Sequence, residues 1–211
     1  GVYPQLGEAE RVKADLEHLR HLDLTPQDAS EPELTYLFKH IVTQEVAYES
    51  LPYAMRALLH DQIGQYIERT FSQTLDQYVD LLAYHYDRSQ NEPKQREYLL
   101  KAGKAAQASY ANAAAINYYQ RVLPLLPPGE QVPVMRQLGQ VLELTGKWSE
   151  AGSLYRQAQE LAEQVGDRHA RAECQIAIGE LLRKQGQYAE ALAALERAQA
   201  EFEELGDRAG V

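Results

Sequence analysis

The histidines are the residues of this sequence that could do the widest range of chemistry, and six are present. His18 and His21 lie three residues apart, a spacing that on a helix could direct two imidazoles at one metal ion. No cysteine or third histidine lies beside this pair, so we expect no metal site. We expect His40, His60 and His85 to hydrogen-bond to backbone or tyrosine groups in a helix interface rather than to catalyse a reaction.

The patterns that mark enzymes are missing from the sequence. Nucleophilic catalysis would need a serine or cysteine in a strained turn near a histidine–acid pair, and no Gly-x-Ser-x-Gly sequence occurs. There is no Gly-x-x-x-x-Gly-Lys-Ser/Thr phosphate loop and no pair of aspartates placed as a nucleotide cyclase needs. The neighbouring carboxylates Glu203 and Glu204 fit a solvated helix face. We therefore expect no catalytic residue, no metal and no cofactor in this chain.

Cys174 is the one cysteine, so an internal disulfide bond is excluded. It lies in a strongly helical segment, 171–185, and we expect a small buried hydrophobic side chain rather than a reactive thiol.

The charge of the chain limits its partners. The 211 residues include 21 lysines and arginines against 31 aspartates and glutamates, a formal net charge of −10. This balance lacks the basic footprint of a nucleic-acid binder and disfavours adhesion to anionic lipid. No apolar run approaches the ~20 residues that span a bilayer, and the first residues do not resemble a signal peptide. We expect a cytoplasmic protein with no nucleic-acid or membrane partner.

A repeat with a period of 40 residues organises the second half of the sequence. At this shift Gly139 falls on Gly179, and the tripeptide 166–168 falls on the identical tripeptide 206–208. Further residues of matching type pair at the same shift: Leu138 with Ile178, Leu142 with Leu182, Gly146 with Gly186, Trp148 with Tyr188, Ala151 with Ala191, and Ala158 with Ala198.

Each repeat is predicted to be a pair of helices. In the first repeat, apolar residues recur at three- and four-residue steps over about 132–145 and again over about 148–164. Gly146 and Gly186 fit the left-handed residue that ends a helix, where a side chain would clash. One helix pair cannot bury its apolar face alone, whereas stacked pairs can.

Small residues are expected where the helices of a pair approach each other. Gly139 and Ala151 lack bulk on facing helices, as do Gly179 and Ala191, which lets the helix axes come close. The aromatic residues expected to fill the space beside them are Trp148, Tyr155 and Tyr188.

This pattern of Leu-Gly, Gly-x-aromatic, Ala, aromatic and Ala resembles the tetratricopeptide repeat, in its variant of about 40 residues. The likeness covers about 130–211, and a weaker copy around Gly103 and Tyr119 lacks the turn glycine near 110–112. The resemblance implies an all-α fold, a right-handed superhelix of antiparallel helix pairs. In that family the first helix of each pair lines the concave side, where the ligand is met. Mapped onto this sequence, that face comprises Arg136, Gln140, Glu143, Ile176, Glu180, Arg183 and Lys184.

Such a concave face carries charges of both signs and could hold an extended peptide or a helix. Arg183 with Lys184 is the best candidate for contact with an acidic group.

The first half is expected to hold helices at about 8–21, 41–51, 53–71, 75–86 and 93–109. Residues 22–25 and 34–38 alternate well enough to be two short strands, separated by a polar stretch at 26–32. This β-hairpin near the N-terminus would fit the tail of a winged-helix domain. The run of Pro124, Pro127, Pro128 and Gly129 is expected to break the helix before the clear repeats.

A second resemblance lies in this half. The string Tyr36-x-Phe38-Lys39-His40-x-x-x-Gln44-Glu45-x-Ala47-Tyr48, followed by Arg56-x-x-x-His60, is similar to a junction in bacterial multidomain signalling ATPases. There it joins the nucleotide-binding module to helical repeats, and similar junctions occur in proteins with a class III nucleotide cyclase. The likeness covers about 11–126. Together the two resemblances imply three segments: the end of a winged-helix-like module and the junction (1–51), a helical linker with a degenerate repeat (52–129), and two repeats with the start of a third (130–211).

Because a third clear repeat should begin at the copied tripeptide 206–208, we expect either an excised fragment or an end covered by a partner or a second copy. The leading hypothesis is a regulatory interaction module of a larger signalling ATPase or nucleotide cyclase. Its partner would be a peptide, another domain of the same parent or a second copy. A DNA-binding regulator is the alternative, with a recognition helix near 11–20. A hydrolase or metal enzyme built on helices is the third.

Overall fold

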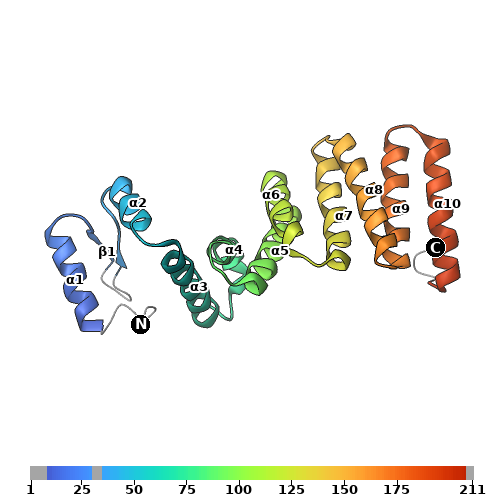
Figure 1. The fold of residues 1–211 in the computed structure, drawn as a ribbon. Coiled ribbons are helices and arrows are strands. Elements are labelled where there is room, and N and C mark those ends of the chain that lie inside the picture. Colours follow the sequence, from blue (N-terminus) through green and yellow to red (C-terminus); the bar gives the residue numbers. More distant parts are fainter. Residues whose placement is uncertain (1–8, 30–34, 208–211) are drawn as a thin grey trace. The chain divides into compact units, whose positions relative to one another are not determined.

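The computed structural model describes residues 9–29 and 35–207, and within them the chain is almost wholly helical (Figure 1). This confirms the all-α fold. Residues 1–92 and 93–211 form two compact units, and the boundary falls inside the segment 52–129. No helix in the described ranges is both long and apolar enough to cross a membrane.

The first unit holds three short elements and four α-helices among its described residues. In order they are α1 (Ala9–His21), β1 (Gln27–Ala29), β2 (Thr35–Tyr36), α2 (Ile41–Glu49), α3 (Tyr53–Thr70), the 3₁₀ helix η2 (Leu75–Tyr78) and α4 (Val79–Asp87). The strands pair antiparallel, with Gln27 opposite Tyr36 and Ala29 opposite Thr35, and the register is irregular between these pairs.

The first strand lies later than the sequence pattern predicts, so the placement at 22–25 is wrong. Those residues instead close the end of α1. Asp23 adopts a left-handed conformation with φ of 58°, and Leu24 N–H donates to the carbonyl of Leu19 at 3.1 Å. Aspartate tolerates this conformation better than most residues, so the turn forms without glycine.

The core of the first unit lies between α3 and α4. A Cβ on Gly64 would come within 2.6 Å of the ring of Tyr86, which is why glycine is needed at this crossing. The Tyr86 hydroxyl donates to Glu68 at 2.8 Å, which satisfies the polar end of this buried ring. In α2, by contrast, none of the described residues is buried.

The second unit is a series of helix pairs. Its elements are α5 (Glu92–Ala108), α6 (Asn112–Val122), the 3₁₀ helix η3 (Leu123–Leu125), α7 (Pro128–Leu144), α8 (Trp148–Gln164), α9 (Arg168–Lys184) and α10 (Tyr188–Leu205). Contacts are dense between α7 and α8, between α8 and α9, and between α9 and α10. The pairs are therefore stacked on one another, as the repeat predicts.

Pro128 and Gly129 do not end a helix as expected but begin one. Pro128 is the first residue of α7, where its missing N–H has no partner to lose and its fixed φ suits the helix. Of the four residues of the predicted break, only Pro124, in η3, and Pro127, beyond it, lie before α7.

Left-handed residues close five of the six described α-helices of the second unit, and α6 instead continues into η3. Gly146, Gly166, Gly186 and Gly206 have φ between 70° and 79°, which confirms the prediction for Gly146 and Gly186. Tyr110 closes α5 with φ of 59°, although it has a side chain. Its turn makes the same bond as the glycine turns: Ala111 N–H donates to Ala106 at 2.8 Å, and Lys147 N–H donates to Leu142 at 2.9 Å.

Close approach within each pair depends on a second set of glycines. The ring of Tyr155 lies against Gly139, and a Cβ at Gly179 would come within 2.8 Å of Leu195. The weaker copy behaves alike, because a Cβ at Gly103 would come within 2.7 Å of Tyr119. Residues 92–122 therefore form a third helix pair of the same construction.

Two of the three aromatic predictions are wrong. Tyr155 is fully buried as expected, but Trp148 at the start of α8 is 40% exposed and Tyr188 at the start of α10 is 71% exposed. In the last pair Leu195, rather than an aromatic residue, lies against the glycine at position 179.

Candidate partner-binding site

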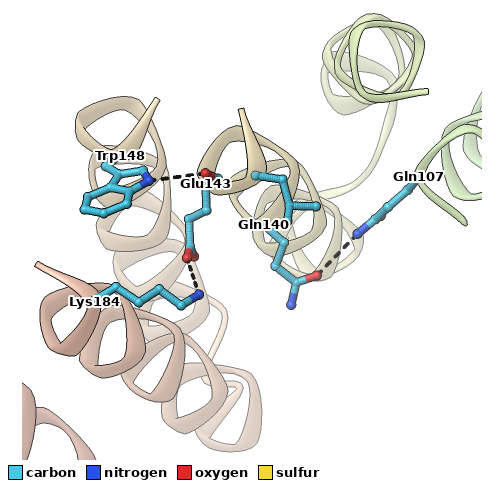
Figure 2. A pocket seen from close by; sticks show the side chains of 6 residues that line it. Gln107, Gln140, Glu143, Trp148 and Lys184 are labelled. Carbon is cyan, nitrogen blue, oxygen red and sulfur yellow. Dashed lines mark hydrogen bonds and ion pairs between the residues drawn. The ribbon is translucent and has the colours of Figure 1, made fainter. Parts of the chain in front are cut away.

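A hollow of about 540 Å³ opens on the second unit between α5, α7 and α9, each of which is the first helix of its pair. It draws residues from the end of α5, the end of α7, the start of α8 and the end of α9 (Figure 2). The lining residues are Gln107, Gln140, Glu143, Leu144, Trp148 and Lys184.

Two side-chain amides face each other across one side of the hollow. Gln107 Nε2 donates to Gln140 Oε1 at 3.5 Å (Figure 2). Gln107 is itself held by the buried Tyr119, whose hydroxyl donates to Gln107 Oε1 at 2.7 Å. Burial raises the pKa of Tyr119 to about 12, so this phenol remains a donor at neutral pH. The pair therefore presents amide donors and acceptors from a fixed position.

Glu143 joins three elements on the other side. Its carboxylate accepts from the Tyr155 hydroxyl at 2.5 Å and pairs with Lys184 Nζ at 2.6 Å. Its backbone carbonyl accepts from the Trp148 indole N–H at 3.2 Å (Figure 2). Burial, followed by the hydrogen bond to Glu143, raises the pKa of Tyr155 far above its usual range. The indole face and Leu144 provide the apolar part of the hollow.

The predicted concave residues lie on α7 and α9, and Gln140, Glu143 and Lys184 line the hollow. The other four lie on the same helices outside this lining. Arg136 pairs with Glu173 across α7 and α9, Ile176 is partly buried, and Arg183 pairs with Glu180 at 2.7 Å. Both cations proposed for an acidic contact, Arg183 and Lys184, are thus already paired within the chain.

Sequence reasoning missed Gln107, Leu144 and Trp148 as lining residues. A signal for Gln107 was present, because placing Gly103 over Gly139 puts Gln107 over Glu143. Trp148 was read as interface filling, and its exposed indole could not be foreseen from spacing alone.

Two histidines of the first unit, His60 and His85, form a separate cluster with Tyr48. His60 Nε2 lies 3.0 Å from the Tyr48 hydroxyl, and His60 Nδ1 lies 2.9 Å from His85 Nδ1. The expected hydrogen bond to tyrosine is confirmed for His60, whereas the ring of His85 is paired with His60 rather than with a backbone or tyrosine group. Burial, followed by the charges of Arg88 and Arg56, lowers the pKa of His60. Burial, followed by His60, lowers that of His85 to about 4.

Two other candidate sites can be compared with the structure. Among the described residues, no three histidine, cysteine, aspartate or glutamate side chains group as metal ligands would. In the proposed DNA-recognition helix α1, Lys13 pairs with Glu10 at 3.3 Å and Arg20 with Glu17 at 2.8 Å. These basic side chains are therefore partly neutralised by acidic side chains of the same helix.

The second unit thus has the architecture of a tetratricopeptide-like helical repeat, with a hollow on the first helices of its pairs. Residues 131–204 match the family model described as tetratricopeptide repeat. No curated protein sequence matches the chain.

Several solved structures share the fold. One is a signal transduction ATPase with numerous domains, carrying a tetratricopeptide repeat sensor, from Pyrococcus horikoshii; the TM-score is 0.57 at 12% identity, over 77% of this chain and 26% of that one. For aspartyl phosphate phosphatase F from Bacillus subtilis the TM-score is 0.56 at 15% identity, over 93% of this chain and 52% of that one. For a Rap protein complexed with competence and sporulation factor the TM-score is 0.51 at 18% identity, over 78% of this chain and 48% of that one. At such identities the likeness is one of fold, and this chain spans about half or less of each of these proteins.

Proposed function

We propose that the second unit is a protein-interaction module that holds an extended segment of a partner protein in the hollow at Gln107, Gln140 and Trp148. The observation that carries this proposal is the combination of paired amides with an exposed indole in one concavity. Glutamine amides can both donate to and accept from a peptide main chain. The indole and Leu144 can pack against a side chain of the segment.

The charges of the hollow suit a segment with an acidic side chain. Lys184 is about half exposed and can turn from Glu143 toward a ligand carboxylate. Glu143 would keep its hydrogen bond from Tyr155 after this exchange. Because one ion pair replaces another, we expect the acidic contact to contribute selectivity more than affinity.

We further propose that the chain is the sensor or docking part of a larger signalling ATPase or nucleotide cyclase and has no catalytic role of its own. Support comes from the junction-like string at residues 36–60. The fold likeness to an ATPase with a tetratricopeptide repeat sensor agrees with this assignment. Another domain of that parent, or a second copy, would then be a natural source of the bound segment.

A displayed library of random 12-residue peptides, selected on the whole chain, tests the binding proposal. Trp148 is the one tryptophan, so its fluorescence reports occupation of the hollow directly for selected peptides that lack tryptophan. We expect selected peptides to change the Trp148 emission and to lose about tenfold in affinity on Gln140→Ala, the loss of one or two hydrogen bonds. Gln199→Ala, on α10 away from the hollow, is the matched control.

Peptides that bind Gln140→Ala and the native chain equally well would refute the binding site. The role in a larger protein is tested separately, by assaying the full gene product for ATP hydrolysis and cyclic nucleotide formation. If neither activity is present, or if Gln140→Ala leaves both rates unchanged with a selected peptide added, the signalling proposal fails while the binding site stands.

A further inference from the structure

A second hollow, of about 170 Å³, lies on α5 and α7, two of the four helices that line the first. It is bounded by α5, by Leu126 beyond η3 and by the first half of α7. Its lining residues are Leu100, Lys104, Leu126, Glu130, Pro133, Val134 and Gln137.

The two hollows follow one seam between α5 and α7. On α5 the lining passes from Leu100 and Lys104 to Gln107, which are steps of four and three residues along one helix face. On α7 it passes from Gln137 to Gln140 in the same direction, again by three residues. A ligand lying along this seam would meet both hollows in turn.

The walls of the second hollow are mainly apolar, with one unmatched polar atom. Leu100, Leu126, Pro133 and Val134 supply the apolar surface. Gln137 Oε1 is buried, and it accepts no hydrogen bond from any residue that the structure describes. A buried acceptor without a donor costs about 1–3 kcal/mol, which a ligand that brings a donor would recover once the amide turns toward it.

The charges at the second hollow favour a neutral occupant. Lys104 and Glu130 carry opposite charges, so neither a cation nor an anion meets a uniform field there. A flat apolar group with one N–H or O–H matches the walls and the free acceptor together.

We infer that the second hollow binds a tryptophan or tyrosine side chain of the same partner segment that occupies the first hollow. The inference rests on the proposed function and names the anchor of its ligand. The hollows are centred about seven helical residues apart, or about 10 Å. An extended chain covers that distance in about three residues. The anchor is therefore separated by about three residues from the part of the segment that lies at Gln140 and Trp148.

The test uses N-acetyltryptophanamide and its 1-methylindole analogue, which lacks the ring N–H, titrated into the ¹⁵N-labelled full chain. We expect amide shifts at Leu100, Lys104 and Val134, and about fivefold weaker binding of the methylated compound, as loss of one hydrogen bond implies. In Gln137→Leu the two compounds should bind alike. This substitution removes the buried acceptor at nearly constant volume, so the variant should fold at least as stably as the native chain. Gln140→Leu, in the first hollow, should keep the fivefold preference.

Equal affinity of the two compounds for the native chain, or shifts confined to other residues, would overturn the inference. Selected peptides that occupy the first hollow but lack a tryptophan or tyrosine about three residues away would also overturn it. Both results leave the proposed function intact. Conversely, failure to select any peptide that depends on Gln140 would defeat the proposed function even where the indole N–H preference is found.

Discussion

Tyr119 lies so close over Gly103 that a Cβ on the glycine would come within 2.7 Å of its ring, and Tyr155 lies over Gly139 in the same way. Both rings are fully buried, and each hydroxyl reaches a residue on the first helix of its pair that lines the larger hollow. The packing of each helix pair and the position of its binding residues are thus coupled through one tyrosine.

We predict that Gly139→Ala destabilises the chain by about 2 kcal/mol, because the added methyl group must displace the buried ring of Tyr155. Urea unfolding followed by circular dichroism measures the change. The matched control is Gly129→Ala in the same helix, where nothing lies within 4 Å of the new Cβ. That control should stabilise by up to about 1 kcal/mol. Equal effects of the two substitutions would contradict the packing argument.

Tyr110→Gly should stabilise the chain by about 0.5–1 kcal/mol. Tyr110 adopts a left-handed conformation while the residue is 77% exposed, so the substitution relieves backbone strain and removes little packing. Thermal or urea unfolding tests this. Gly146→Ala places a side chain in the equivalent turn and should destabilise by about 1 kcal/mol. A less stable Tyr110→Gly protein would show that the ring makes contacts that outweigh the strain.

Glu201→Ala should destabilise by about 2 kcal/mol. This carboxylate is 5% exposed and accepts hydrogen bonds from Arg171 at 2.5 Å and from Arg168 at 3.0 Å. Its loss leaves two guanidinium groups with one fewer partner at the junction of α9 and α10. Glu204→Ala, which removes an exposed partner of Arg168 alone, should cost less than about 0.5 kcal/mol. Similar unfolding midpoints for the two variants would count against a structural role for Glu201.

The histidine pair should make stability depend on pH. Burial, followed by His60 and Arg88, lowers the pKa of His85 from 6.5 to about 4. A base whose pKa is lower in the folded than in the unfolded state stabilises the fold fully above the unfolded value. That contribution is lost as the pH falls through the folded value. We therefore expect a loss of roughly 2–3 kcal/mol between pH 6.5 and 4 from this residue.

The measurement is the free energy of unfolding of the native chain and of His85→Gln across this pH range. Carboxylates also titrate there, so the difference between the two profiles isolates the histidine. NMR titration of the His85 ring gives its pKa independently. Parallel profiles, or a ring pKa near 6.5, would show that the contact with His60 does not hold the imidazole neutral.

Much of the second unit could be predicted from sequence because glycine leaves few alternatives. Gly146 and Gly186 have the left-handed conformation expected of them, and Gly139 and Gly179 lie at the predicted close approaches. The left-handed conformation of Tyr110 could not be predicted, because tyrosine, unlike glycine, does not favour that conformation. Pro128 was misjudged because proline both ends helices and begins them, and only the neighbouring residues decide.

The site was harder to predict than the fold. Gln140, Glu143 and Lys184 were reached by mapping one helix face, but the hollow also needs Trp148 from the next helix and Gln107 from the degenerate pair. The second hollow depends on Leu126, which lies in a connection with no repeat pattern. Each hollow combines residues from several helices or connections, so the periodicity within a single helix cannot predict which residues line it.

The buried thiol of Cys174 allows local opening of the second unit to be measured. Its thiol is inaccessible among Val132, Met135, Ala158 and Ala170, and burial raises its pKa to about 12. A thiol reagent can therefore react only during excursions in which α9 leaves its neighbours, at a rate set by how often these occur. Because α9 also carries Lys184, a bound peptide should slow the labelling of Cys174. The ratio of the labelling rates without and with peptide would then measure how far the ligand suppresses opening of α9.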